Sequence, residues 1–417
     1  KKYKYAIKGN PTIGSIKNIM IGLKNPSQVN GDLLSGEVWF NELRLSEIDG
    51  KGGWSALASL DANLADFAQI SLTGKMSTIG FGSIDKSPNQ RSREELKQYG
   101  LISSLNLGQL LPNKWEIQIP VSYSISEEFS TPEYDPFFQD IKLEDRINSA
   151  TRNSQKDSIK SQAISYRKVS SINLLGVKKN RSAEQKERVY DIENFDFSYS
   201  YNQELQHDYE IENFTKKTAR VSSAYNYTFN PFVISPFKKI KFLENNKYLE
   251  WIKEFNFNPL LSSLSFDANI NRTFNSQRFR DIFVEGADSS NQIALPEIQQ
   301  RNFLFDWNLS LSQNLSNSLR IDFSASNNSI VKNYFETDVM GDMAVNKELD
   351  IWDGFWNTGE ANSHNQSFGV TYELPFKLFP FINFISSSYN YSGDFNWERG
   401  SDAMALVEDD LGNVLGN

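Results

Sequence analysis

The sequence predicts an all-β protein, an antiparallel transmembrane barrel wall of about twelve strands. The clearest observation is in residues 303–315, where every second residue of 305–312 is apolar and those between are polar. Side chains alternate sides along a strand, so this pattern predicts a sheet that separates an apolar phase from a polar one. Such a stretch exceeds the roughly five or six residues of a soluble strand and reaches the roughly 9 to 11 that cross a bilayer.

The same alternation recurs along most of the chain and defines the expected strands in order. They cover residues 54–64, 68–76, 101–107, 115–126, 166–174, 195–202, 220–229, 264–270, 303–315, 319–329, 368–374 and 385–397. The stretch at 166–174 carries the weakest pattern.

The composition supports a membrane barrel over a helical membrane protein. Hydrophobic residues make up 39% of the chain, the mean hydropathy is -0.51 and no run of about 18 apolar residues occurs. A transmembrane barrel turns half its side chains to water, so its average hydropathy is that of a soluble protein. The 30 Phe, 17 Tyr and 8 Trp are typical of strands and interfacial girdles. A soluble, aromatic-rich β-sandwich that binds surfaces remains an alternative.

Charge and cysteine content exclude several other classes. The net charge of -9 argues against a nucleic-acid partner, because phosphate binding requires a basic surface. The absence of Cys excludes disulfides, thiol catalysis and thiolate metal sites. We therefore expect no cofactor.

The connections between the expected strands alternate in length, as they do in bacterial barrels. Long segments at 77–100, 127–163, 275–302 and 330–366 fall on one side if the strand at 166–174 exists, and only 230–262 breaks the rule.

Two of these connections have helical character. Residues 239–255 read as an amphipathic helix, a periplasmic insertion that packs on the barrel rim, docks a partner or lies at the membrane surface. Charged residues at 144–164 predict a solvated helical stretch.

The two ends differ from the strand region. Residues 1–50 read as the end of a small β-sandwich-like domain, and residues 51–397 as the barrel strands with their long outer loops. Residues 398–417 read as an outer loop or a truncated segment. No signal peptide precedes Lys1, so we expect both ends to be cuts through a longer chain.

Residues suited to catalysis are scarce, so we expect no enzyme and no catalytic site. The chain has two His, His207 and His364, and lacks the common hydrolase, nucleotide and metalloprotease motifs. An outer-membrane hydrolase, the enzyme alternative, could use His207 with Asp208 or His364 with Glu360. Carboxylates at 338–350 and 408–410 match no calcium-binding loop, and we expect no metal site.

One segment resembles a known family. Residues 36–45, GEVWFNELRL, followed by KGGW at 51–54 and STIGFGS at 77–83, resemble the SprA/Sov family. These are outer-membrane translocons of the type IX secretion system of Bacteroidetes, a system linked to gliding motility. The resemblance covers about 50 residues, and the downstream strands are compatible with it without being diagnostic.

The resemblance implies more than the periodicity does. Family members form a very large single-chain barrel with a protein-sized lumen in the bacterial cell outer membrane. They export folded cargo proteins that carry a C-terminal signal domain. Their companions include a PorV-type barrel, a periplasmic plug protein and other accessory subunits. This chain would then supply only a segment of such a wall.

The strand pattern assigns residues to the two sides of this wall. Apolar and aromatic side chains are expected to face lipid or form girdles: Trp115, Ile117, Ile119, Tyr123, Phe197, Tyr199, Phe266, Phe305, Trp307, Leu309, Phe323, Tyr372, Tyr389, Tyr391 and Trp397. Polar side chains are expected to face the lumen: Gln118, Ser122, Ser198, Asn226, Asp267, Asn269, Asp306, Asn308, Ser310, Asp322 and Ser324.

These observations predict a protein-conducting channel segment that contacts outer-membrane lipid and secreted cargo. A closed outer-membrane pore of twelve strands for solutes is the transport alternative.

Overall fold

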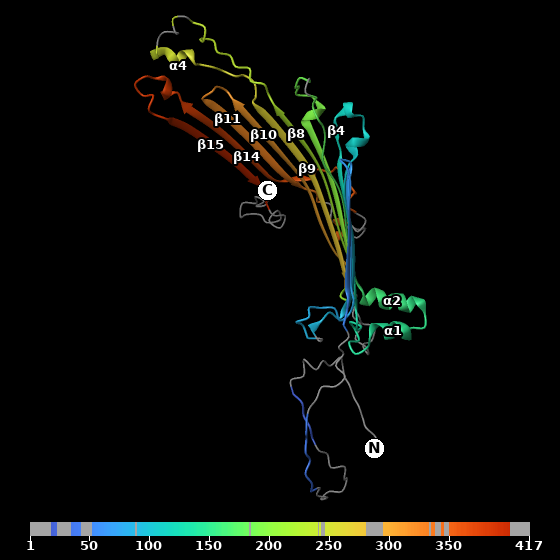
Figure 1. The fold of residues 1–417 in the computed structure, drawn as a ribbon. Coiled ribbons are helices and arrows are strands. Elements are labelled where there is room, and N and C mark those ends of the chain that lie inside the picture. The colour runs from blue at the N-terminus through green and yellow to red at the C-terminus, as the bar shows by residue number, and fades with distance from the viewer. Residues whose placement is uncertain are drawn as a thin grey trace.

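The protein forms one strongly twisted antiparallel sheet in this computed structural model (Figure 1). The structure describes residues 18–22, 35–42, 52–87, 90–182, 185–240, 242, 247–280, 295–332, 335–337, 343–345 and 350–400. Within these residues the long strands follow one another in chain order, so each hairpin packs beside the one before it.

The main sheet runs from β1 at one edge to β15 at the other. Its strands are β1 (Ser55–Leu64), β2 (Ala68–Ser77), β3 (Glu94–Asn106), β4 (Ile117–Gln118), β5 (Pro120–Pro132), β6 (Ser165–Lys179), β7 (Phe195–His207), β8 (Ile211–Thr228), β9 (Ser263–Phe279), β10 (Ile298–Asn314), β11 (Leu319–Ile330), β14 (Glu360–Leu374) and β15 (Ser387–Glu398). A separate hairpin pairs β12 (Phe335–Thr337) with β13 (Met343–Val345). The predicted all-β class and the number of long strands are confirmed, and the strand at 166–174 exists as β6.

Short helices and 3-10 turns lie in the connections. They are η3 (Leu107–Leu110), η4 (Asn113–Trp115), α1 (Leu143–Ser149), α2 (Asn153–Ala163), η5 (Ile192–Asn194), η6 (Lys247–Leu249), α4 (Glu250–Lys253) and η8 (Phe376–Leu378). None of the helices in the described ranges is long and apolar enough to cross a membrane.

The connections lie along the two sides of the sheet where the strands begin and end, and we call these sides the α4 edge and the α1 edge. They are distinct from the outer strands β1 and β15. The α4 edge carries the connections 65–67, 107–119, 180–194, 229–262, 315–318 and 375–386, and the α1 edge carries 78–93, 133–164, 208–210, 280–297 and 331–359. Figure 1 shows α4 above one edge and α1 and α2 below the other. All four connections predicted to be long share the α1 edge, although the turn at 208–210 on that edge is short.

The sheet is open rather than closed into a barrel. In the described part of the chain β1 pairs with β2 alone and β15 with β14 alone, and these end strands do not pair with each other. Closure within this chain, as the alternative of a twelve-stranded pore requires, is therefore not observed.

The strand predicted at 115–126 is interrupted. Trp115 ends η4, and Glu116 adopts a left-handed conformation with φ of 50°. Residue Ile119 lies between β4 and β5, and β4 pairs with β6 instead of extending the β3 ladder. Pro112 and Pro120 lack the N–H that a continuous ladder needs, so the strand begins at Pro120.

The helical predictions are met in part. Residues 144–164 form α1 and α2, and acidic Glu144 and Asp145 in the first turn of α1 favour its N-terminus. In the described part of 239–255, Phe242, η6 and α4 are helical, and residues 241 and 243–246 lie outside the described residues. Of the domain expected at 1–50, the described residues 18–22 and 35–42 form neither helix nor strand, and the rest lies outside the described residues, as do 401–417.

Candidate functional site

The candidate functional site is the pair of faces that the sheet presents. Antiparallel partners point to the same side, so the register carries a face from one strand to the next. Tyr123 pairs with Ile172, which pairs with Tyr201. In the later strands Phe323 pairs with Phe368 and Val370 with Tyr391. We call this side the apolar face and the opposite side the polar face.

The register places the predicted strand residues consistently on these faces. The apolar face carries Tyr123, Phe197, Tyr199, Phe266, Phe305, Trp307, Leu309, Phe323, Tyr372, Tyr389, Tyr391 and Trp397. The polar face carries Ser122, Ser198, Asn226, Asp267, Asn269, Asp306, Asn308, Ser310, Asp322 and Ser324. Trp115, Ile117, Gln118 and Ile119 lie in the irregular 107–119 connection, outside these ladders. Their assignment to lipid or lumen stays a prediction.

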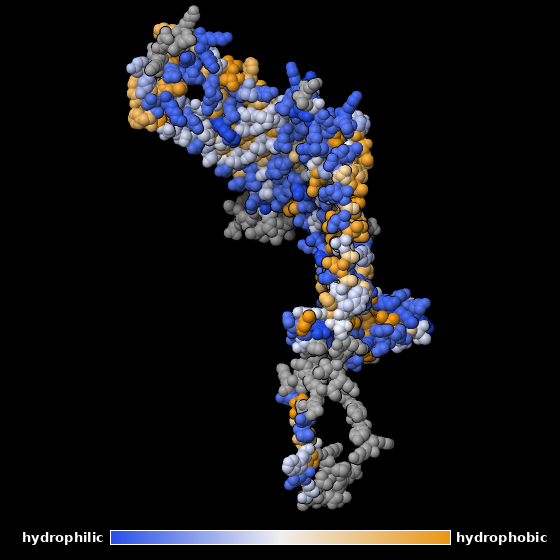
Figure 2. Space-filling model, viewed as in Figure 1, coloured by the Kyte–Doolittle hydropathy of each residue, from blue (hydrophilic) through white to orange (hydrophobic). Residues whose placement is uncertain are grey.

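Side chains on the polar face bond to one another across strands. The Asp267 carboxylate accepts hydrogen bonds from the side-chain amides of Asn308, at 2.9 Å, and Asn269, at 3.4 Å. The Arg220 guanidinium donates to Asn269 Oδ1 at 3.0 Å. Ser265 Oγ donates to Asn226 Oδ1 at 2.7 Å. These contacts satisfy the polar groups locally, and the face becomes a hydrophilic surface of amides and hydroxyls (Figure 2).

The apolar face is bounded toward the α1 edge by aromatic and charged side chains. Phe129 packs on Tyr166, with ring centroids 4.8 Å apart, and Tyr166 packs on His207 at 5.3 Å. One step closer to the α4 edge, Lys168 Nζ lies 3.1 Å from Glu127 Oε1, and the Tyr99 hydroxyl donates to Glu127. The apolar band therefore ends inside β3, β5, β6 and β7.

Part of the apolar face is covered by the chain itself. Residues 350–357, which we call the strap, pack Ile351 and Phe355 against Ala219 and Ile270, and Phe305 packs against this cluster. Trp352 stacks on Tyr201 with centroids 5.6 Å apart. Phe305, predicted to face lipid or form a girdle, is thus partly covered by protein.

Two cations under the strap were not predicted from the sequence. Arg272 is fully buried on the apolar face, and Lys217 Nζ lies 3.0 Å from Asp350 Oδ1. Burial raises the pKa of the Asp350 carboxyl, but hydrogen bonds from the Ile351 amide and from Lys217 outweigh it and hold the pKa below its ordinary value. Arg272 and Lys217 occupy apolar-face positions in their strands, a departure from the alternation that was a signal for a covering segment.

The motif residues at 52–54 and 77–83 meet in space. The Trp54 amide donates to Thr78 Oγ1 at 2.9 Å, and the Thr78 amide donates to the Trp54 carbonyl at 2.9 Å. A Cβ on Gly53 would lie 2.2 Å from the Phe81 nitrogen, so only glycine allows this close approach. The motif therefore fastens the entrance of β1 to the β2–β3 connection.

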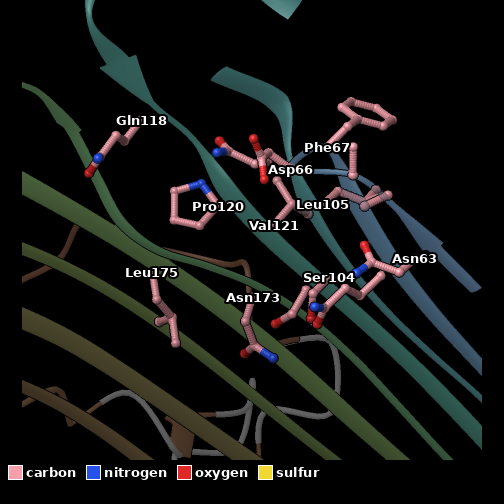
Figure 3. A pocket seen from close by; sticks show the side chains of 15 residues that line it. Asn63, Asp66, Phe67, Ser104, Leu105, Gln118, Pro120, Val121, Asn173 and Leu175 are labelled. Atoms are coloured by element: carbon pink, nitrogen blue, oxygen red, sulfur yellow. The ribbon is translucent and has the colours of Figure 1, made fainter. Parts of the chain in front are cut away.

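A cavity of about 680 Å³ opens near the α4 edge of β1 to β6 (Figure 3). Figure 3 shows Asn63, Ser104 and Asn173 gathered on one side of it, with Gln118 and Pro120 toward the other. Among the lining residues that the structure describes, Asp66 is the single charged one. The cavity thus offers amides and hydroxyls but no acid–base pair.

The two histidines are not paired with the acids considered from the sequence. Asp208 Oδ1 accepts from the Ile211 amide at 2.7 Å and shapes the β7–β8 turn. His364 contacts Gln366 at 2.8 Å, while Glu360 pairs with Arg399. Within the described ranges no three His, Asp or Glu side chains cluster as metal ligands. The prediction of no enzyme stays a prediction, and the carboxylates at 408–410 lie outside the described residues.

A sheet whose faces differ in polarity from the first strand to the last defines a two-sided β-wall. Residues 1–147 match the family model SprA_N, described as a motility related/secretion protein. This match over about a third of the chain bears out the resemblance carried by residues 36–83 and supports membership of the SprA/Sov family. A search of the curated proteins finds no match.

Proposed function

We propose that this chain is a wall segment of an outer-membrane channel that exports folded proteins by type IX secretion. The observation that carries the proposal is the polarity difference between the two faces, which the register carries from β2 to β15 between the aromatic boundary and the α4 edge. The match to a secretion-related family supports it, and an all-β sheet is compatible with the outer membrane.

The height of the apolar band fits a bilayer. On β11 the apolar face runs from Leu319 past Phe323 to Ala325, where it meets Asn327. At about 3.3 Å per residue and a tilt of about 40°, residues 319–325 span roughly 15–18 Å, and the apolar face of β15 from Tyr389 to Trp397 spans roughly 20–23 Å. The apolar band of outer-membrane barrels is roughly 25 Å tall. The lipid-facing surface would therefore lie between the aromatic boundary and the α4 edge.

The polar face would line the passage. Its side chains already bond to one another, so they offer few unmatched groups to a passing protein, and the surface stays hydrated. In this arrangement the cargo carries a C-terminal signal domain. A PorV-type barrel, a periplasmic plug protein and other accessory subunits are the partners that the family resemblance implies.

The width of the passage favours a segment over a closed pore. Twelve strands about 4.8 Å apart and tilted about 40° would close at a diameter of roughly 24 Å. A folded domain of about 100 residues has a radius of gyration of about 13 Å, hence a diameter of roughly 33 Å. A wall that passes such a domain needs additional strands beside the outer strands β1 and β15.

Cysteine accessibility tests the orientation. The chain has no Cys, so single-cysteine variants at Trp307, Asn308, Leu309 and Ser310 each report one position. We expect aqueous maleimide to label Asn308→Cys and Ser310→Cys in membranes, and to leave Trp307→Cys and Leu309→Cys unlabelled. The opposite pattern would refute the assignment of the faces, and equal labelling of all four would refute a membrane wall.

A further inference from the structure

The connection between β8 and β9 reaches across its neighbours at the α4 edge. The Asn258 amide donates to the Leu315 carbonyl at 2.8 Å, and the Asn317 amide donates to Asn256 Oδ1 at 2.8 Å, in the β10–β11 turn. Residues 248 and 251 of the same connection reach the β14–β15 connection, where their aromatic rings stack on those of residues 379 and 381. Three successive hairpins are therefore fastened together at this edge.

The stacked rings form a surface that we call the rim platform. Tyr248 stacks on Phe381 with ring centroids 5.6 Å apart, and Trp251 stacks on Phe379 at 6.0 Å. Phe384 follows in the same connection. The exposed fractions are 61% for Tyr248, 65% for Phe381 and 80% for Phe384. Large aromatic side chains gathered at such exposure mark a surface that contacts something other than water.

Acids and aromatic rings are both exposed at η6 and α4. Glu250 and Glu254 line a cavity of about 520 Å³ together with Asn317, Ser318 and Glu373, and both acids are exposed. Tyr248 and Trp251 take part in the exposed stacks. The rings therefore stay at the surface of this edge.

The surroundings of the rim platform suit phospholipid head groups. Lys238 and Lys239 are exposed in the same connection, and Phe237, which precedes them, packs on Phe255 with ring centroids 6.1 Å apart. Exposed lysines near aromatic rings favour an anionic membrane surface. The apolar face continues to this edge through Tyr372 and Tyr389, the third cross-strand pair from the β14–β15 connection. Figure 2 shows hydrophobic residues along the outer margin of this end of the sheet. Tyr and Trp are the residues that settle at the level of the head groups.

We propose that the rim platform lies in the phospholipid head-group layer and fixes the depth of the β8–β15 part of the sheet. This inference rests on the proposed function, because it requires the apolar face to lie against lipid. The rings enter the boundary between head groups and acyl chains, and the lysines stay among the phosphates.

Depth-dependent quenching tests the platform. Single-cysteine variants Phe384→Cys, Tyr391→Cys and Asp157→Cys are labelled with an environment-sensitive fluorophore. The protein is then reconstituted in phosphatidylethanolamine–phosphatidylglycerol vesicles that contain spin-labelled lipids. Tyr391 reports the apolar face, and Asp157, exposed on α2 at the opposite edge, is the matched aqueous control. We expect a blue shift and loss of fluorescence at 384 and 391, with shallow spin labels more effective at 384, and neither effect at 157.

The outcomes separate the two proposals. Quenching at 391 without quenching at 384 overturns the platform and leaves the wall intact, and it would assign the exposed rings to a protein partner. No quenching at 391 removes the membrane wall itself and the platform with it.

The lysines provide a second readout. Replacing Lys238 and Lys239 together by Glu should weaken quenching at 384 in anionic vesicles but not in purely zwitterionic ones. An equal effect in both vesicle types would contradict a role for head-group charge.

Discussion

Arg272 on β9 donates hydrogen bonds to the carbonyl oxygens of Phe355, at 2.9 Å, and Asn357, at 2.6 Å, although more than eighty positions separate them in the chain. A third bond joins Arg272 to the Leu304 carbonyl at 2.8 Å. The guanidinium is fully buried and lies over the Phe303 ring, 5.3 Å from its centroid. One cation thus holds the strap against the sheet.

Replacing Arg272 by Met should release the strap. The change leaves buried carbonyl groups without their donor, which costs about 1–3 kcal/mol for each group that water does not reach. We expect faster hydrogen exchange of the Ile351 and Phe355 amides and faster proteolysis within 350–357. Arg320→Met is the matched control, because Arg320 is exposed and pairs with Asp322 on the same strand. Unchanged exchange in Arg272→Met would contradict the role of this contact.

Replacing Gly53 by Ala should weaken the contact between residues 52–54 and residues 77–83. The added Cβ would meet the Phe81 nitrogen and the Ile79 oxygen, both backbone atoms that cannot rotate away. Overpacking of this kind costs about 1–3 kcal/mol. Protection of the Trp54 and Thr78 amides should fall in exchange measurements. Gly52→Ala, whose Cβ would meet no atom within 4 Å, should change neither protection nor stability.

Alternation along a strand is a local pattern. For that reason the sequence predicted most strands and which residues of each strand share a face. Each of the twelve stretches carries its own polarity pattern, and the antiparallel order then follows from the connections. Most strands are longer than predicted, and β1 and β15 are slightly shorter. β5 continues through Glu127 and Glu128, where cross-strand contacts such as Lys168 with Glu127 stabilise charged positions that the apolar pattern cannot reveal.

Contacts that depend on distant segments were not predicted. The strap is one case, since nothing in residues 350–357 specifies that Phe355 packs over Ala219. The fold of 107–119 is another. Residues 115–126 were predicted as one strand, whereas the left-handed Glu116 and the missing N–H of Pro120 divide the ladder, and β5 begins at Pro120. The stacking of Trp251 on Phe379 likewise required the three-dimensional arrangement of two connections.

The Lys179–Glu193 pair should make the 180–194 connection sensitive to acid. Lys179 Nζ donates to Glu193 Oε1 at 2.6 Å, and this bond holds the pKa of the Glu193 carboxyl below its ordinary value. A lowered folded pKa contributes stability that is complete above the unfolded value, about 4.3, and is lost as the pH falls through the folded pKa. The protection of the Asn194 amide, its exchange rate relative to that of an unfolded chain at the same pH, should therefore fall over that acid range.

Two variants check this pH dependence. Glu193→Gln removes the titrating group and should flatten the acid limb of the exchange profile. Lys179→Met should shift that limb toward higher pH, because the carboxylate loses the cation that lowers its pKa. An acid limb that persists unchanged in both variants would assign the titration to another group.

Replacing Leu309 by Arg should destabilise the sheet in a membrane, whereas replacing Ser310 by Arg should have little effect. Leu309 pairs with Phe266 and Ala325 in the middle of the apolar face, and Ser310 lies opposite on the polar face. An arginine that faces lipid near the bilayer midplane costs about 2–4 kcal/mol. Ser310→Arg, one residue away in the same strand, places the same charge in water. Unfolding of both variants from reconstituted membranes by denaturant gives the difference directly. A comparable loss in the two variants would mean that both faces meet similar surroundings, and that outcome is incompatible with a wall between lipid and an aqueous passage.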